Sequence, residues 1–213
     1  MITDERFVAY INSLDAGNPA YLDELEAYAI QTQVPIIRKE MQSFMRTMLL
    51  MNKPKRILEV GTAIGFSALL MSEFMPQDGH ITTIENYEKR IPIAKANFQK
   101  YGKEDRITLL EGDAAEVLKT LEGPYDFIFM DAAKGQYIHY LPQIMRILTP
   151  GGVLISDNVM QDGDIIESKY AVTRRDRTIH RRMREYMYTL THHEELQTSI
   201  LTLGDGVAVS VRK

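Results

Sequence analysis

The sequence contains no cysteine among its 213 residues. This absence excludes disulfides, thiolate metal sites and cysteine nucleophiles together, and it is typical of a reducing compartment. The sequence also lacks any apolar run that approaches the roughly 20 residues of a membrane span. The first seven residues, from Met1 to Phe7, include acidic side chains where a signal peptide needs a basic segment followed by an apolar core. We therefore expect a cytoplasmic protein that does not associate with membranes.

An overall excess of positive charge is absent as well. The chain has 25 Lys and Arg residues against 29 Asp and Glu residues, which gives a formal net charge of −4. Binding to nucleic acid would therefore have to depend on a local cluster of basic residues. The 45% hydrophobic content is enough for a substantial core.

Apolar residues recur at helical spacing over the first 52 residues, for example at Phe7, Ile11 and Leu14. Beyond Pro54, short apolar segments alternate with helix-like stretches. These segments cover residues 56–60, 81–85, 107–111, 125–130 and 152–156. This alternation predicts an α/β fold with a doubly wound, Rossmann-like parallel sheet, in which ligands bind outside the carboxyl ends of the strands.

The two last apolar segments, residues 198–203 and 207–211, are separated only by Gly204-Asp205-Gly206. Such a short turn predicts a C-terminal antiparallel hairpin. We expect one domain over residues 1–213, composed of an N-terminal helical segment (1–52) and an α/β core (53–213).

The segment from Arg56 to Ser67 carries the clearest ligand-binding pattern, because an apolar strand leads through a glycine-rich turn directly into a helix. Gly61 and Gly65 allow the backbone to approach a ligand closely, and the helix that starts near Phe66 points its free N–H groups at the same place. A tight turn without a ligand would have the same pattern. The spacing Glu-x-Gly-x-x-x-Gly differs from the dinucleotide-binding Gly-x-Gly-x-x-Gly. It resembles motif I of the class I S-adenosylmethionine (SAM) methyltransferases.

Further candidates for cofactor contacts lie near the ends of neighbouring segments. Glu85 follows the glycine turn by roughly 20 positions, the separation at which a carboxylate one strand over can accept two hydrogen bonds from a ribose diol. Gly112 and Asp113 follow the third strand, where Asp113 either caps the next helix or accepts a hydrogen bond from an adenine amino group. Ser67 and Ile37 are candidates for contact with the amino-acid end of the cofactor, although a packing role for Ile37 fits equally well.

Oxygen ligands follow the fourth and fifth predicted strands. Asp131 ends the fourth strand, and Asp157 and Asn158 end the fifth. A single aspartate at a strand end is usually a turn former, but these side chains should converge on one cleft beside Lys134. Carboxylate and amide oxygens suit Mg²⁺ or a similar hard cation.

Taken together, Glu59-x-Gly61, Asp131 with Lys134, and Asp157-Asn158 resemble the metal-dependent O-methyltransferases related to catechol and caffeoyl-CoA methyltransferases. Within that family, the sequences at 25–29, 34–36, 131–137 and 204–206 are most similar to the bacterial tRNA 5-hydroxyuridine methyltransferases, which form 5-methoxyuridine at the wobble position. The resemblance implies a SAM cofactor that Asp131 also contacts, and a homodimer. It further implies Mg²⁺ held by Asp131, Asp157 and Asn158, with Lys134 as the base or proton acceptor of a catalytic pair with Asp131.

The metal site does not distinguish the substrates, because a catechol and 5-hydroxyuridine both offer two neighbouring oxygens. A local basic cluster is the distinguishing feature: residues 174–184 contain six arginines and one acid. These arginines either contact tRNA phosphates or form a solvated helix face whose charges pair with glutamates. The position after the fifth strand favours binding of a tRNA anticodon stem-loop through Arg174, Arg175 and Arg177.

Three functions therefore stay open. They are a tRNA methyltransferase, a methyltransferase of small catechols or acyl-CoA thioesters, and a noncatalytic SAM-binding module. The last is disfavoured, because a binding module does not need Lys134 or the three oxygen ligands.

Overall fold

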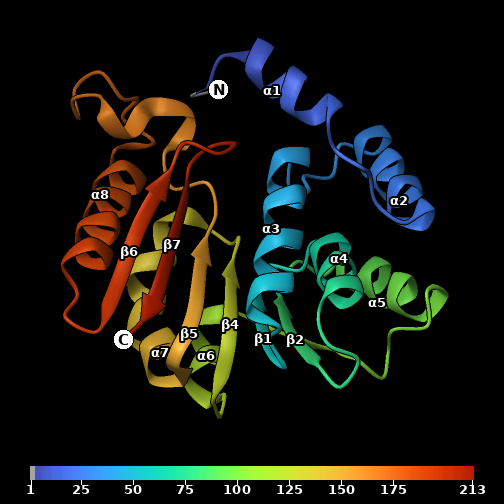
Figure 1. Ribbon diagram of the computed structural model, residues 1–213. Coiled ribbons are helices and arrows are strands. Elements are labelled where there is room, and N and C mark those ends of the chain that lie inside the picture. The colour runs from blue at the N-terminus through green and yellow to red at the C-terminus, as the bar shows by residue number, and fades with distance from the viewer. Residues whose placement is uncertain (1–2) are drawn as a thin grey trace. The chain divides into compact units, whose positions relative to one another are not determined.

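The computed structural model describes residues 3–213, so that Met1 and Ile2 of the N-terminal segment considered above lie outside the described residues (Figure 1). The described chain forms two compact units, an N-terminal unit (Arg6–Ala114) and a C-terminal unit (Ala115–Lys213, with the residues up to Glu5). A single domain over residues 1–213 stays a prediction. Within residues 3–213, no helix is both long enough and apolar enough to cross a membrane.

The N-terminal unit contains a three-stranded parallel sheet in the order β3-β2-β1. Its strands are β1 (Arg56–Val60), β2 (His80–Glu85) and β3 (Ile107–Glu111). Its helices are α1 (Glu5–Ser13), α2 (Ala20–Gln31), α3 (Lys39–Asn52), α4 (Phe66–Phe74) and α5 (Ile91–Lys100). All residues of β1 after the first are buried, as expected for a strand whose two faces are covered.

The C-terminal unit contains four strands in the order β4-β5-β7-β6. These are β4 (Tyr125–Met130), β5 (Leu148–Ser156), β6 (Leu196–Leu201) and β7 (Val207–Arg212). β4 and β5 are parallel, whereas β7 is antiparallel to both β5 and β6. The remaining elements are α6 (Ala114–Thr120), η1 (Lys134–Gln136), α7 (Tyr137–Ile147), η2 (Gln161–Ile166) and α8 (Arg177–His192).

The predicted strands are present in the order expected, and the antiparallel C-terminal hairpin is confirmed. The bounds of two strands differ from the prediction by more than one residue. β5 begins earlier, at Leu148, and β6 covers Leu196–Leu201 instead of residues 198–203. The last hairpin pair is Leu201 with Val207, and the Gly206 N–H donates to the Leu203 carbonyl at 2.8 Å. Leu203 is therefore part of the turn, which makes the connection longer than the three predicted residues.

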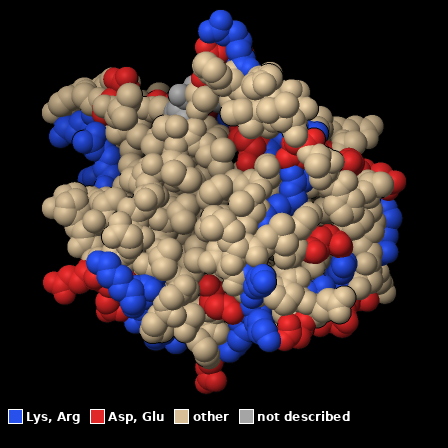
Figure 2. Space-filling model, viewed as in Figure 1, with Lys and Arg blue, Asp and Glu red and all other residues tan. Residues whose placement is uncertain are grey.

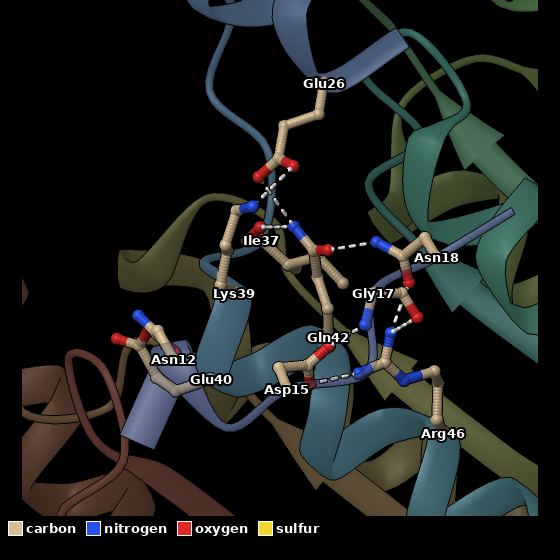
Figure 3. A network of polar contacts seen from close by, with 10 residues as sticks. All are labelled: Asn12, Asp15, Gly17, Asn18, Glu26, Ile37, Lys39, Glu40, Gln42 and Arg46. Atoms are coloured by element: carbon tan, nitrogen blue, oxygen red, sulfur yellow. Dashed lines mark hydrogen bonds and ion pairs between the residues drawn. The ribbon is translucent and has the colours of Figure 1, made fainter. Parts of the chain in front are cut away.

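A buried polar network joins the N-terminal helices (Figure 3). Gln42 on α3 is only 2% exposed. Its Nε2 donates to Glu26 Oε1 on α2 at 3.1 Å and to the Ile37 carbonyl at 3.0 Å. Its Oε1 accepts a hydrogen bond from Asn18 at 2.7 Å, and Asn18 also accepts one from Arg46. The network fixes the segment before α3 and the loop between α1 and α2 onto α3.

Candidate active site

The glycine turn after β1 has a backbone that only glycine adopts readily. The φ angles of Gly61 and Gly65 are +106° and +86°. A Cβ at Gly65 would lie 2.5 Å from Cε1 of Phe98 on α5, so packing within the fold also requires glycine there. The φ angle and the contact with Phe98 both require glycine at position 65 without a ligand, so neither tests the predicted close approach of a ligand there. α4 begins at Phe66, where the sequence predicted a helix N-terminus directed at the turn.

Glu85 lies at the carboxyl end of β2, only 9% exposed, and its carboxylate binds the glycine turn directly. Its Oε2 accepts the N–H of Ala63 at 2.8 Å. Its Oε1 accepts the N–H groups of Asn86 at 3.0 Å and Tyr87 at 2.8 Å. An ionised carboxylate has about four acceptor positions, so roughly one is left for a ligand hydroxyl. The carboxylate is held in place, and one direct hydrogen bond to a ribose diol fits better than two.

The other predicted cofactor contacts are placed as follows. The Gly112 N–H donates to the Glu85 carbonyl at 2.9 Å, which brings the ends of β2 and β3 together. Asp113 is exposed directly before α6, a position compatible with both roles proposed for it. Ser67 is buried in the first turn of α4. Ile37 is 5% exposed, which supports a packing role at least.

The oxygen ligands of the C-terminal unit meet at the carboxyl ends of β4 and β5. Met130 pairs with Ser156 in the parallel register, so Asp131 and Asp157 follow paired residues. Asn158 Nδ2 lies 3.3 Å from Asp131 Oδ1, and the Asn158 N–H donates to Asp157 Oδ1 at 2.7 Å. The three side chains are thus close together, as the sequence predicted.

Two carboxyl groups in this position are electrostatically costly when both are ionised. Burial and the neighbouring Asp131 raise the pKa of Asp157 to about 7. Burial also raises the pKa of Asp131, although Lys134 and Asn158 oppose this shift. A cation among these oxygens would offset the repulsion between the two carboxylates.

The donor set fits a hard cation in part. Two carboxylates and one side-chain amide are ligands that Mg²⁺ accepts, with water or substrate completing the octahedron. Within residues 3–213, no three His, Cys, Asp or Glu side chains are grouped as a metal site. The candidate set therefore depends on the amide oxygen of Asn158. Asparagine O and N are interchangeable by rotation of the amide, so the contact between Nδ2 and Asp131 does not oppose that role.

Lys134 begins η1, directly after the loop that carries Asp131. Its Nζ lies 3.1 Å from Oδ2 of Asp205 in the turn between β6 and β7. The Asp205 side chain is 2% exposed, and that of Lys134 is 34% exposed. The sequence identified Asp205 only as part of a turn, and no local pattern indicates that this turn reaches Lys134.

Tyr137 is a second residue whose contribution to the site was not predicted. Its buried hydroxyl accepts the N–H of Ala132 at 3.2 Å and lies 3.2 Å from the carbonyls of Met130 and Asp157. It therefore joins the ends of β4 and β5. Burial, with Asp131 nearby, raises the pKa of Tyr137 well above its usual value, so the phenol stays protonated and can donate.

The arginines of residues 174–184 fall into two groups. Arg182 and Arg184 donate to the carbonyls of Gly135 and Ile165, and Arg181 pairs with Glu185 at 3.5 Å. The arginines predicted to bind tRNA are exposed and form no ion pair within residues 3–213. They are Arg174, Arg175 and Arg177, of which Arg177 donates from Nε to the Val172 carbonyl at 3.4 Å. The alternative to tRNA binding was a solvated helix face whose arginines pair with glutamates. Within the described chain, such pairing applies to Arg181 alone.

Three of these arginines border a groove of about 580 Å³ between the Glu167–Lys169 segment and α8. Lys169, Arg177, Arg181 and Arg184 contribute to its lining. Figure 2 shows Lys and Arg side chains gathered over the segment before α8 and the start of that helix. The surface is suited to an anionic ligand.

An α/β fold with parallel strands, a C-terminal antiparallel hairpin, this glycine turn and acidic residues at the strand ends defines a Rossmann-like methyltransferase fold. Solved structures agree over nearly the whole chain. A candidate caffeoyl-CoA O-methyltransferase from Staphylococcus aureus is 30% identical with a TM-score of 0.90, covering 99% of this chain and 100% of that one. The S-adenosylhomocysteine (SAH)-bound methyltransferase PaMTH1 from Podospora anserina is 31% identical with a TM-score of 0.88, covering 98% and 94%.

The O-methyltransferase family model matches residues 12–213, so the chain belongs to the O-methyltransferase family. Among curated relatives, a catechol O-methyltransferase from Mycobacterium tuberculosis is 31% identical over 161 residues, covering 74% of this chain and 73% of the relative. A caffeoyl-CoA O-methyltransferase from Populus kitakamiensis is 29% identical over 175 residues, covering 79% and 74%. The resemblance to the class I SAM O-methyltransferases of the catechol and caffeoyl-CoA type is thereby confirmed.

Proposed function

We propose that this O-methyltransferase uses SAM and Mg²⁺ to methylate the 5-hydroxyl of hydroxyuridine at the wobble position of tRNA. The family assignment supports the methyl transfer, and the PaMTH1 structure with bound SAH supports SAM as the donor. One observation carries the choice of tRNA. The exposed Arg174, Arg175 and Arg177 have no acidic partner within the described chain, so their charges are available for phosphates.

In the reaction, the hydroxyl oxygen of the substrate attacks the sulfonium methyl group. A C–O bond forms, the C–S bond breaks, and SAH leaves. The hydroxyl proton passes to the amine of Lys134, whose ammonium form pairs with Asp205. The hydroxyl oxygen must attack the methyl group in line with the C–S bond that breaks, so the hydroxyl must be held in a fixed direction. Holding the two reactants in this geometry supplies much of the rate enhancement.

Within this proposal, Asp131, Asp157 and Asn158 hold the Mg²⁺. When bound, Mg²⁺ makes a coordinated hydroxyl easier to ionise and fixes the direction of two neighbouring oxygens. Glu85 accepts a ribose hydroxyl, and Ile37, Gly61, Ser67, Gly112, Asp113 and Asp131 complete the SAM contacts. A homodimer remains part of the proposal.

The second candidate function is O-methylation of a small catechol or a caffeoyl-CoA-like thioester. The names of the curated relatives favour it. The polar character of η2, with Asp162 and Asp164, does not favour it, because an apolar ring is better bound by an apolar lid.

A direct comparison of substrates tests the proposal. Purified enzyme with SAM and Mg²⁺ is given tRNA that contains 5-hydroxyuridine and, separately, a catechol such as 3,4-dihydroxybenzoic acid. Nucleoside mass spectrometry should show 5-methoxyuridine formed in the tRNA at a much higher kcat/KM than the methylated catechol. If the catechol is methylated efficiently and the hydroxyuridine of the tRNA is not, the second function would be established instead.

A further inference from the structure

The turn between β6 and β7 makes contacts with two different parts of the candidate active site. Asp205 is 3% exposed, and its two carboxylate oxygens have different partners. Oδ2 lies 3.1 Å from Lys134 Nζ, and Oδ1 accepts the backbone N–H of Asp162. A buried carboxylate is strongly disfavoured unless it is paired and hydrogen-bonded, and both conditions are met here.

The second partner belongs to the loop that follows β5, which has an unusual backbone. Asn158, Gln161 and Asp162 are non-glycine residues with φ of +59°, +50° and +52°. Such left-handed residues are uncommon and persist only where their surroundings fix them.

The fixing contacts come largely from the turn. The Val159 N–H donates to the Gly206 carbonyl at 2.9 Å, and the Met160 N–H donates to the Asp205 carbonyl at 3.0 Å. Gly206, at φ +83°, must be glycine, because a Cβ would lie 2.4 Å from Met160 Cγ. The main chain of the turn therefore holds the loop even without the Asp205 side chain.

This division of contacts separates two roles of Asp205. Its main chain and Oδ1 support the loop that carries Asn158, whereas Oδ2 has Lys134 as its partner. The Lys134 stem has several rotatable bonds, and its 34% exposed side chain would otherwise sample several directions. The Lys134 nitrogen can donate an N–H to this carboxylate both as an amine and as an ammonium, so the pairing gives the flexible stem a fixed direction in each form.

We propose that Asp205 is a positioning residue for the reaction: its Oδ2 fixes the Lys134 amine in the direction needed to serve the substrate hydroxyl. The inference rests on the proposed catalytic function of Lys134. Asp205 acts on the reaction by way of Lys134 and does not itself contact the substrate.

A double-mutant cycle tests this role. Asp205→Asn keeps an oxygen that accepts the Asp162 N–H but removes the oxygen that pairs with Lys134. We expect kcat to fall about 10- to 100-fold, the range in which misplacement of a reacting group acts, with KM and SAM affinity nearly unchanged. In Lys134→Met, the further change Asp205→Asn should alter kcat by less than about twofold, because residues acting as a unit are not additive.

Glu195→Gln is the matched control, because it breaks the 2.7 Å ion pair with Arg212 in the same hairpin and should leave kcat unchanged. The assays use hydroxyuridine tRNA or 3,4-dihydroxybenzoic acid, whichever the wild type methylates. If Asp205→Asn does not fold, as judged by thermal unfolding, the cycle is repeated with Asp205→Ser, whose hydroxyl can accept the Asp162 N–H.

The outcomes separate this inference from the proposed function. Wild-type kcat in Lys134→Met would remove the catalytic role of Lys134 and this inference with it. Loss of kcat in Lys134→Met with wild-type kcat in Asp205→Asn would overturn the inference alone. Additive losses in the double mutant would also overturn it, because Asp205 would then act through the loop.

Discussion

At the scale of single residues, Glu85 shows how a side chain can serve the fold and a ligand together. Its three hydrogen bonds to backbone N–H groups fix the glycine turn, and roughly one acceptor position remains. Glu85→Gln replaces one oxygen by an amide group that faces an N–H donor. We expect SAM affinity to fall by about 1–3 kcal/mol, the usual cost of a buried donor or acceptor left unpaired.

Isothermal titration calorimetry with SAM measures this change. Glu88→Gln, an exposed substitution three residues further along the chain, is the matched control and should bind SAM as the wild type does. Unchanged SAM affinity in Glu85→Gln would exclude Glu85 from the cofactor site.

The raised pKa of Asp157 leads to a prediction about pH. An unfolded aspartate titrates near 3.9, whereas the folded pKa of Asp157 is about 7 without a cation. Between these values the folded state holds more protons than the unfolded state, so this group's contribution to stability falls as pH rises from about 4 to 7. Mg²⁺ binds the ionised carboxylates, so it should raise the melting temperature more at pH 8 than at pH 5.5.

Thermal unfolding with and without Mg²⁺ at both pH values measures this effect. Asp157→Asn should lose most of the Mg²⁺ stabilisation at pH 8, and Asp105→Asn, a change at an exposed aspartate, should keep it. An equal Mg²⁺ effect in Asp157→Asn and wild type would argue against these oxygens as the metal site.

At the scale of elements, the turn between β1 and α4 depends on a residue from α5. Gly65→Ala meets two obstacles, a left-handed backbone and the ring of Phe98 at 2.5 Å. The first costs about 1–2 kcal/mol. We therefore expect a larger loss of stability than in Gly102→Ala, which has a φ of +61° but no neighbouring atom within 4 Å.

Urea denaturation gives the free energy of unfolding of both variants. Phe98→Leu, added to Gly65→Ala, should recover part of the loss by making room for the methyl group. If the two alanine variants lose equal stability, the ring of Phe98 adapts without cost, and the backbone alone explains the glycine.

The sequence predicts elements better than it predicts the contacts between their ends. Short apolar segments of the correct length identified the strands, because burial on both faces leaves a strong pattern. The strand pattern also predicted that Asp131 and Asp157 lie together, because parallel strands have their carboxyl ends at the same edge of a sheet. The pairing of Asp205 with Lys134 and the contact of Gly65 with Phe98 join residues distant in sequence. No local pattern encodes those distances, so only the folded chain reveals them.

The same limit explains the shifted bounds of β6. The Gly204-Asp205-Gly206 sequence correctly indicates a turn, but the hairpin register decides where pairing stops. Leu201 is the last paired residue, and Leu203 accepts a turn hydrogen bond instead of a strand bond. Propensity alone favours continuing the strand through Leu203.

At the scale of the whole molecule, charge is distributed unevenly on an acidic protein. The net charge is −4, yet residues 174–184 contain six arginines. These arginines differ in their partners. Arg182 and Arg184 donate to backbone carbonyls and Arg181 pairs with Glu185, whereas Arg174, Arg175 and Arg177 form no ion pair in the described chain. A small neutral catechol gains nothing from such a cluster. A CoA thioester gains from its few phosphates, and a polynucleotide gains from each of the many phosphates that are neutralised.

Replacing Arg174, Arg175 and Arg177 together by glutamine should therefore raise the KM for hydroxyuridine tRNA steeply and leave SAM affinity unchanged, because phosphate contacts position the RNA and not the cofactor. The slope of log affinity against log salt should become shallower by roughly 0.7–0.9 for each lost phosphate contact, as measured by filter binding over a salt series.

A control variant with Lys89, Lys95 and Lys100 replaced by glutamine removes the same charge from α5 and from a position two residues before its start. If both variants change KM and the salt slope equally, the effect is one of net charge; if neither changes them, the tRNA is held by other residues. A loss confined to the arginine variant would identify this cluster as the tRNA-binding surface.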